Sequence, residues 1–399
     1  MKSNKNQPGV PWSGRGSRYS PSDIEFIVQA IRDSDPLTQG RYQNEFEDAF
    51  RAYTETSHAF AVSSCTAALH LAAILSGVGE GDEVIMPAHT FAASAIPFAR
   101  TGARLVWADI DPATLVVSAD TIAPLITPAT KVVVVVHLYG LMADMDPIMA
   151  LAESHELLVV EDAAQALGAN YKGRQAGSIG DFGCFSFHSH KNISTLGEGG
   201  MLTVKDAALA RQAPGLRHNG MRAYKGEREH YWKPAMSNVD FDRPNLWPFN
   251  YCIGEVQCAA GITQIHKVDE LNAFRQSRAK TFMRAVSDFP ELVFQATPVD
   301  HENVFYCLPA RYLGTDANRD RDDFMARMSL HHKVQMVIQY HPLYRYPMFK
   351  SAGFGEANCP ETDVFFDQMV SFPFHPWMPQ DQFDFMIDAT RETLSELRQ

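Results

Sequence analysis

A carboxylate and an amine stand at the ends of two predicted strands. Asp162 ends the apolar strand 157–162, and Lys191 follows the strand 184–188 by three residues. Taken alone, Asp162 could be a helix N-cap and Lys191 a solvated surface lysine. A carboxylate that emerges from a buried strand needs a cationic partner, however, because leaving it unpaired costs several kcal/mol in a low-dielectric interior. The glycine-rich run 197–200 would let the backbone near Lys191 approach a ligand closely.

A hydroxyl-bearing turn supplies a candidate anion site. Ser64, Cys65 and Thr66 connect a predicted strand at 58–63 to a predicted helix at 66–75. Free N–H groups and hydroxyls at a helix N-terminus bind anions without any net positive charge. An acid for a ring nitrogen, an amine for a Schiff base and a seat for a phosphate are together what pyridoxal 5′-phosphate (PLP) requires of a protein.

Several other kinds of site lack support in the sequence. No GxGxxG opens a helix after the first strand, no GxxxxGK[ST] occurs, and the GxSxG of serine hydrolases is absent. His188 with His190, or His331 with His332, could be read as metal ligands. Neither pair has an acidic or thiolate cluster beside it, so we expect no metal site.

The composition sets limits on partners and location. The chain has 399 residues, of which 45% are hydrophobic and 21% charged, as in ordinary globular proteins. Its 35 Lys and Arg face 47 Asp and Glu, a net charge of −12 that argues against nucleic acid or an anionic membrane as partner. No apolar run approaches the roughly 18 residues that span a bilayer, and the polar amino terminus does not look like a signal peptide. Six scattered cysteines without a CxxC pair predict reduced thiols, and the chain is expected to be cytoplasmic.

The elements that must position these side chains alternate along the chain. Short β-branched runs are separated by helix-length segments, and the run of valines at 132–136 is continuously apolar, as in a strand covered on both faces. Ser20 before Pro21 predicts the start of the first helix. The pattern predicts an α/β fold with a mostly parallel sheet wrapped by helices. Its seven strands are expected at 58–63, 83–87, 104–110, 131–138, 157–162, 184–188 and 200–204.

The predicted domain organisation follows from residue 204 onward, where the regular alternation of predicted strands and helices stops. A long helical pattern covers 254–287, and we predict a polar segment at 1–19, a large domain at 20–265 and a smaller α/β domain at 266–399. The irregular stretch 221–250 could hold a nucleotide diphosphate by charge and stacking, or could be a solvated loop. Its candidate side chains are Arg222, Lys225, Arg228, Tyr231, Trp232 and Lys233.

Five motifs occur together and in order over residues 40–265, and with them the sequence resembles the DegT/DnrJ/EryC1/StrS family of PLP-dependent sugar aminotransferases of fold type I. The motifs are S-x-T-A-A-L, P-x-x-T-F, H-L-Y-G, E-D-A-A-Q-A and S-F-H-x-x-K-N-x-x-x-x-G-E-G-G.

The resemblance implies a role for each matching residue. Lys191 would form the Schiff base and later move the proton, and Asp162 would keep the pyridine nitrogen protonated. Gln165 would hydrogen-bond the ring 3-oxygen, and Phe91 would stack on the ring, although a Phe after a strand is usually a core residue. The remaining matches are expected to contact the phosphate: Ser64, Thr66 and Ser186 from the same chain, and Asn250 from the partner subunit of a homodimer.

Three departures from the family pattern bear on the substrate. Cys65 stands where the family usually has Gly, so that the phosphate turn must accept a side chain. Cys252 stands where Arg is usual, which removes a charge near the site. Tyr344 stands where His is common.

The function implied is transfer of an amino group from glutamate or glutamine to a keto-sugar, nucleotide-linked in the first instance, or to a keto-cyclitol. Two alternatives remain open. A PLP-dependent sugar dehydratase of this family typically has His in place of the lysine, and Lys191 is present. A non-catalytic PLP-binding sensor would keep the fold and cofactor, but no basic patch or extra domain supports it.

Overall fold

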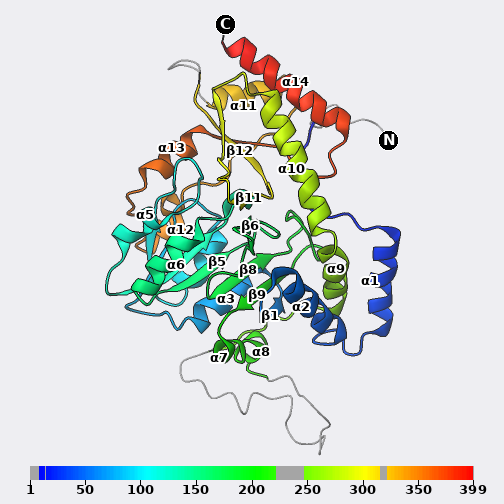
Figure 1. Ribbon diagram of the computed structural model, residues 1–399, viewed down its shortest axis with the longest axis vertical. Coiled ribbons are helices and arrows are strands. Elements are labelled where there is room, and N and C mark those ends of the chain that lie inside the picture. Colours follow the sequence, from blue (N-terminus) through cyan, green and yellow to red (C-terminus); the bar gives the residue numbers. More distant parts are fainter. Residues whose placement is uncertain (1–8, 14, 222–246, 315–320, 399) are drawn as a thin grey trace, which may run out of the picture.

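The computed structural model describes residues 9–13, 15–221, 247–314 and 321–398, and its centre is one seven-stranded sheet (Figure 1). Neighbouring strands are parallel, except that β9 runs antiparallel to both of its neighbours, β1 and β8. The prediction of an α/β fold with a mostly parallel seven-stranded sheet is confirmed. In spatial order the strands are β1 (Ala59–Val62), β9 (Gly200–Val204), β8 (Phe182–Ser186), β5 (Leu158–Asp162), β4 (Thr130–Val136), β2 (Glu83–Pro87) and β3 (Arg104–Ala108).

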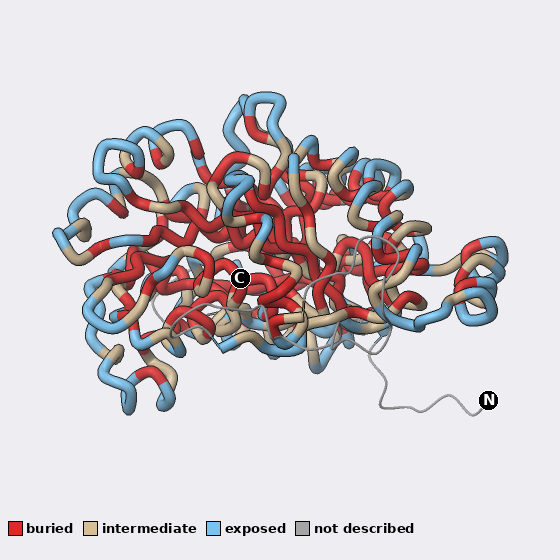
Figure 2. The backbone as a smooth tube through the Cα atoms, turned by 90° about the horizontal axis from the view of Figure 1, so that it is seen from below, coloured by how far each residue is buried: buried red, intermediate tan, exposed pale blue. Residues whose placement is uncertain are grey.

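The sheet lies in the interior of the molecule. In Figure 2 buried backbone runs through the middle and exposed loops surround it. The valines of β4 at 132–136 are almost fully buried, as expected for a strand covered on both faces. Because both faces of the sheet are covered, a ligand can bind only at the ends of the strands. The candidate site residues lie at the ends of β5 and β8.

The first helix begins where the sequence predicts it. Ser20 caps α1 (Pro21–Asp33): its hydroxyl accepts from the Asp23 amide and its own amide donates to the Asp23 carboxylate, a capping box. The other helices of this part of the chain are α2 (Arg41–Thr54), α3 (Cys65–Leu75), α4 (Ile96–Ala99), α5 (Ala119–Ile122), α6 (Met145–Ser154), α7 (Ala207–Ala210) and α8 (Ala213–Arg217).

The long helical pattern at 254–287 is two helices, not one. α9 (Glu255–Ile265) packs against α1 and α2, and α10 (Val268–Ala285) continues towards the C-terminal part of the chain. Lys267 lies at the junction and pairs with Asp23 of α1. Acidic residues in the first turn of α10 suit a new helix N-terminus. Since no Gly or Pro marks the junction, periodicity alone could not reveal it.

A second hydrophobic core lies along α10. It is built on the antiparallel sheet β10 (Leu292–Phe294), β12 (Leu308–Tyr312) and β13 (Met369–Phe372), with α11 (Arg321–Leu330) and α14 (Gln380–Leu397) packed around it. A small sheet of β6 (Asn170–Tyr171), β7 (Arg174–Gln175) and β11 (His301–Glu302) ties the two parts of the chain together.

Not all of the C-terminal region joins that second core. Leu343, Phe349 and Phe365 belong to the first core, together with the helices α12 (Pro347–Ser351) and α13 (Pro360–Gln368) that carry the last two. The domain limits at 20–265 and 266–399 stay a prediction.

The polar segment before α1 is held against the rest of the molecule. Val10 pairs with Val334, and the Trp12 amide donates to Gln335. Further along, the Gly16 amide donates to the Ser189 carbonyl at 2.5 Å. The segment therefore joins the C-terminal part to the loop that carries Lys191. In the described part of the chain, none of the helices has the length and apolarity to cross a bilayer.

Candidate active site

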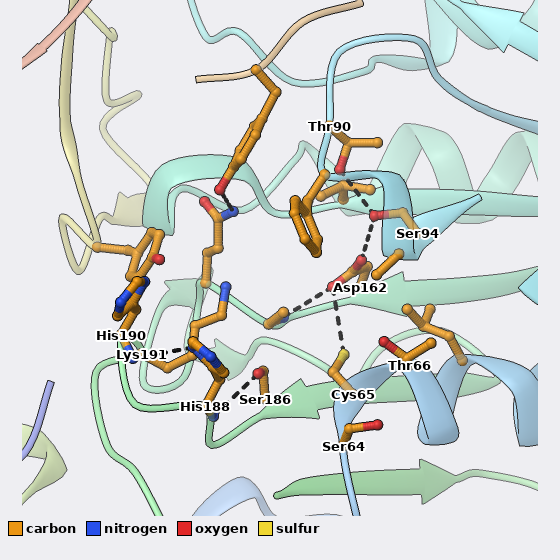
Figure 3. Close-up of a pocket in the computed structure, with 18 of the residues that line it drawn as sticks. Ser64, Cys65, Thr66, Thr90, Ser94, Asp162, Ser186, His188, His190 and Lys191 are labelled. Carbon is orange, nitrogen blue, oxygen red and sulfur yellow. Dashed lines mark hydrogen bonds between the residues drawn. The ribbon is translucent and has the colours of Figure 1, made fainter. Parts of the chain in front are cut away.

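A cavity of about 400 Å³ opens at the carboxyl ends of β5 and β8, within the size range of small-molecule sites (Figure 3). It brings together almost every residue that the sequence singled out: Ser64, Cys65, Thr66, Phe91, Asp162, Gln165, Ser186 and Lys191. Further lining comes from Thr90, Ser94, His188, His190, Glu198, Tyr306, Gln339 and Tyr340.

Asp162 is the anchored acid at the end of β5. It is 5% exposed, accepts a hydrogen bond from the Ser94 hydroxyl at 2.7 Å and accepts another from the Ala164 amide at 3.1 Å. Thr90 in turn lies 2.9 Å from Ser94, hydroxyl to hydroxyl. The expected cationic partner is not in contact, since no ion pair involves Asp162 among the described residues. Hydroxyl and amide donors hold the carboxylate in place instead.

Lys191 projects into the middle of the pocket, away from Ser94 and Thr90 (Figure 3). Its amine lies 4.6 Å from the centre of the Tyr306 ring and makes no hydrogen bond to any described residue. Burial lowers the pKa of this amine below its ordinary value, and the charge of Asp162 partly offsets the effect. An unbonded amine with a lowered pKa is suited to nucleophilic attack.

The turn that the sequence predicts as a phosphate seat lies at the start of α3. Ser64 is the N-cap and accepts from the Ala67 amide at 3.1 Å, while the first-turn amides of Cys65 and Thr66 have no intrahelical acceptor. Ser186 faces this turn from the end of β8. A Cβ on Gly200 would lie 2.4 Å from the Ser64 backbone, so only glycine lets β9 pass this close to the turn.

Cys65, the departure from the family's glycine, turns inward. The residue is buried, and its sulfur lies 3.9 Å from Oδ1 of Asp162. Burial, followed by the charge of Asp162, raises the pKa of the thiol well above its usual value. Cys65 is therefore a neutral thiol that donates weakly to the carboxylate, and its side chain does not fill the phosphate seat.

Gln165 and Phe91 also line the pocket, near Tyr340. The Gln165 amide is fixed: its oxygen accepts from the Tyr139 amide at 2.8 Å and its nitrogen donates to the Tyr340 hydroxyl at 3.2 Å. Phe91 is 56% exposed, with its ring 5.7 Å from that of Tyr340. Such exposure rules out the core role that a Phe after a strand usually has, and leaves a ring face open to the pocket.

Three sequence-derived positions lie outside the pocket. Asn250 is exposed and caps its own turn by accepting from the Cys252 amide at 3.0 Å. Cys252 is half-buried, and its thiol lies 3.8 Å from the Arg217 carbonyl. Tyr344 bonds Asp363. The candidate nucleotide-binding side chains at 222–233 lie outside the described residues.

The sequence analysis missed the Ser94 hydroxyl beside Asp162, the Tyr306 ring beside the Lys191 amine and the Tyr340 hydroxyl beside Gln165. Ser94 follows Phe91 by only three residues, and a hydroxyl so close to a strand end was the available signal. Tyr306 and Tyr340 come from the C-terminal part of the chain, more than 100 residues from Lys191 in sequence. No local pattern there indicates that they reach the pocket.

The residues present fit PLP. An anchored carboxylate, an unbonded amine with a lowered pKa and a helix N-terminus with free amides surround one cavity, and Gly200 clears the space beneath the phosphate turn. His188 and His190 also line it, with rings 4.9 Å apart. Within the described ranges no group of three or more potential ligands is arranged to hold a metal, and all six cysteines are free thiols.

Comparison with known proteins agrees with this geometry. The profile of the DegT/DnrJ/EryC1/StrS aminotransferase family matches residues 21–391. The spore coat polysaccharide biosynthesis protein SpsC of Bacillus subtilis is 34% identical over 93% of this chain and 94% of its own. The GDP-perosamine synthase of Caulobacter vibrioides is 41% identical over 65% of this chain and 66% of its own.

The fold comparison points the same way. The crystal structure of an aminotransferase from Psychrobacter cryohalolentis superposes with a TM-score of 0.88 at 27% identity, covering 98% of this chain and all of that one. A profile match over nearly the whole length, with a relative above 30% identity, settles the assignment. The chain belongs to the DegT/DnrJ/EryC1/StrS aminotransferase family.

Proposed function

We propose that this protein transfers an amino group from glutamate or glutamine to a keto-sugar, with Lys191 as the residue that bonds covalently to PLP. The observation that carries the proposal is the convergence of Lys191 and Asp162 in one cavity, opposite the open N-terminus of α3. The activity class itself follows from family membership: the protein is a PLP-dependent aminotransferase of the sugar-modifying kind.

When bound, PLP supplies an electrophilic carbon that takes up an amine and a ring that withdraws electrons from the neighbouring carbon. Lys191 has two tasks in the proposal. Its unprotonated amine would serve as the nucleophile, and the same amine would later hold the proton that leaves the substrate carbon. Both tasks need the neutral form, and burial of the Lys191 amine favours that form.

The other pocket residues would hold and orient the cofactor. Asp162 would keep a proton on the ring nitrogen, and the Ser94 hydroxyl and Ala164 amide fix the direction in which the carboxylate points. Gln165 would donate to the ring 3-oxygen, and Phe91 would stack on the ring. Ser64, Thr66 and Ser186 would hold the phosphate, together with the amides at the start of α3.

A nucleotide-linked keto-sugar is the first choice of acceptor, because one relative is named a GDP-perosamine synthase. A keto-cyclitol is the second. The protein would act as a homodimer in which Asn250 reaches the phosphate of the partner's site. In support, Asn250 is exposed and Trp247 beside it is 80% exposed, an unusual state for a tryptophan in an isolated chain. A cytoplasmic location is consistent with six free thiols.

The test separates the two half-reactions. Purified protein loaded with PLP is mixed with glutamate or glutamine in the absence of any acceptor, and the absorbance spectrum is followed for conversion to pyridoxamine phosphate. We expect conversion with at least one donor. The converted enzyme is then offered a panel of nucleotide-linked keto-sugars and keto-cyclitols, and the amino product is identified by mass spectrometry.

Each alternative function has its own outcome in this experiment. No conversion with any amino donor would favour a sensor that only binds the cofactor. Loss of water from the sugar without incorporation of nitrogen would favour a dehydratase. Either result would overturn the proposal.

A further inference from the structure

Arg275 of α10 carries a buried charge with no carboxylate to balance it. The side chain is 2% exposed, yet no Asp or Glu among the described residues forms an ion pair with it. Within the described part of the chain, its hydrogen bonds run only from one terminal nitrogen to the backbone carbonyls of Phe305, at 3.5 Å, and Tyr306, at 3.3 Å. Nε is buried and has no hydrogen-bond partner there. An unbalanced buried cation is costly, so its presence calls for a ligand.

The guanidinium borders a cavity of about 20 Å³ next to the main pocket. His190 and Tyr306 line both cavities, and Tyr306 is the ring beneath the Lys191 amine. Cys307, also in the wall, lies close enough that its ionisation would be felt by both Lys191 and Arg275. The small cavity is therefore adjacent to the reacting amine. Its remaining walls come from Trp12, Ser13, Arg15, Phe374 and His375.

The surroundings of this cavity are positive. Burial, and after it the charges of Arg275, Arg18 and Arg278, lowers the pKa of His375 to about 4. Its Nδ1 is buried without a hydrogen-bond partner. Burial lowers the pKa of Arg275 itself to about 10, which still leaves it charged at neutral pH. The cavity is thus faced by the cations Arg15 and Arg275 and by a neutral His375, with no carboxylate among its lining residues.

We propose that this Arg275 cavity binds the α-carboxylate of the amino donor. The inference rests on the proposed function, because it assumes that an amino acid is the donor. In an amino acid the carboxylate and the departing amine are attached to the same carbon, so a carboxylate site must lie beside the residue that handles the amine. The Arg275 cavity meets that condition through Tyr306 and His190.

A carboxylate suits the cavity better than the phosphates of a nucleotide-linked acceptor. Planar guanidinium groups bind carboxylates through two parallel hydrogen bonds, and Nε is the free nitrogen that such a pair would use. The Arg275 cavity is small, about 20 Å³, and a carboxylate is a much smaller group than a diphosphate. The site would also explain selectivity among amino donors, because an amine without a carboxylate leaves Arg275 unpaired.

The experiment compares Arg275→Gln with wild type in each half-reaction. For Arg275→Gln we expect the donor concentration at half-maximal conversion to rise about tenfold to hundredfold with both glutamate and glutamine, the range for losing a charged hydrogen bond. The acceptor concentration at half-maximal rate in the second half-reaction should stay the same. Arg275→Lys keeps the charge but loses the two parallel hydrogen bonds of the guanidinium, so its half-maximal donor concentration should rise less, by about threefold to tenfold. This variant replaces Arg275→Gln in the test if Arg275→Gln does not fold.

The matched control is Arg278→Gln. Arg278 lies one turn along α10, donates to the Met378 carbonyl at 2.7 Å and contributes to the same positive field, but it does not line the cavity. We expect its donor dependence to remain near that of wild type. An equal loss in both variants would show that only the general field matters, and an equal loss towards donor and acceptor in Arg275→Gln would show a structural role. Either outcome overturns the proposal.

A binding measurement separates this inference from the proposed function. Glutarate has carboxylates but no amine, so its binding can be followed by calorimetry without any reaction. We expect wild type and Arg278→Gln to bind it and Arg275→Gln to bind it at least tenfold more weakly. If wild type converts no donor but shows this pattern, the proposed function fails and the carboxylate site stands. Equal binding by all three proteins would refute the site.

Discussion

The sheet side of the pocket and the C-terminal side, where the adjoining Arg275 cavity lies, differ in how their polar groups are satisfied. On the sheet side, Asp162 and Gln165 have hydrogen-bond partners at most of their polar atoms before any ligand arrives. In the Arg275 cavity, Nε of Arg275 and Nδ1 of His375 are buried without partners among the described residues.

This difference separates a permanent site from a transient one. A group that holds a cofactor through every cycle can be locked into one geometry by its neighbours. A group that must bind and release a substrate needs donor or acceptor atoms that no protein group occupies. Leaving these atoms without hydrogen bonds between cycles costs free energy. We therefore expect substitutions on the sheet side to abolish the chemistry, and those on the C-terminal side to alter substrate affinity.

The largest effect is expected from Lys191→Ala. Without the amine there is neither a covalent attachment nor a proton carrier, so turnover should fall at least about 10³-fold. After borohydride treatment, mass spectrometry of the Lys191→Ala protein should show no covalent PLP adduct, and denaturation should release all of the bound PLP. Lys205→Ala is the control, since the Lys205 amine donates to the Ile179 carbonyl and does not line the pocket. Full turnover in Lys191→Ala would remove the central assignment.

Asp162→Asn comes next. The amide keeps the shape of the side chain but cannot hold a ring nitrogen protonated, so PLP should still bind while turnover falls by about 10²-fold. Steady-state rates and cofactor content measured on the same preparation distinguish the two effects. Asp146→Asn, on an exposed carboxylate paired with Lys172 and Arg174, serves as control. If turnover is unchanged, Asp162 is only a structural residue at a strand end.

Gly16→Ala probes the link between the two sides. A Cβ at residue 16 would lie 1.6 Å from the Lys191 carbonyl oxygen, so the loop that carries the amine must shift. A displacement of this kind should lower turnover by about tenfold, and because the clash is with backbone it should lower the melting temperature as well. In Gly9→Ala the nearest atom is 3.7 Å away, and no loss is expected. Equal rates in both variants would mean that the loop absorbs the change without moving the amine.

The smallest effect is a shift in pH dependence. Only the neutral amine captures an aldehyde, and burial lowers the pKa of Lys191. Capture of PLP by the cofactor-free protein, followed by absorbance, should therefore reach its midpoint below the ordinary lysine value of about 10.4. Because the charge of Asp162 raises that pKa, Asp162→Asn should move the midpoint lower still. A midpoint that moves upward would contradict this coupling.

The sequence predicts the sheet side well and the other side poorly, for a physical reason. Strand ends in an α/β sheet converge, so Asp162, Lys191 and the turn at Ser64 could be placed together from local patterns alone. Tyr306 reaches the pocket, and Arg275 the adjoining cavity, through the packing of α10 against the chain just before β12, which depends on contacts between distant parts of the chain. Nothing in their local sequence distinguishes them from ordinary core residues.

The break between α9 and α10 was missed for a related reason. The hydrophobic periodicity continues across the junction, so it does not show that α9 ends at Ile265. Lys267, two residues later, pairs with Asp23 of α1. The roles assigned to individual site residues, and the homodimer, remain predictions for the experiments above.

The segment before α1 has a practical consequence for anyone who trims or tags this protein. A shortened chain that begins at Ser20 would keep α1 and every helix and strand that follows it, so its circular dichroism spectrum would look normal. It would nevertheless lose Trp12, Ser13 and Arg15 from the wall of the Arg275 cavity, and the Gly16 contact to the Lys191 loop. Such a preparation could be well folded and still be a poor enzyme, so the amino-terminal end should be left intact in any assay of activity.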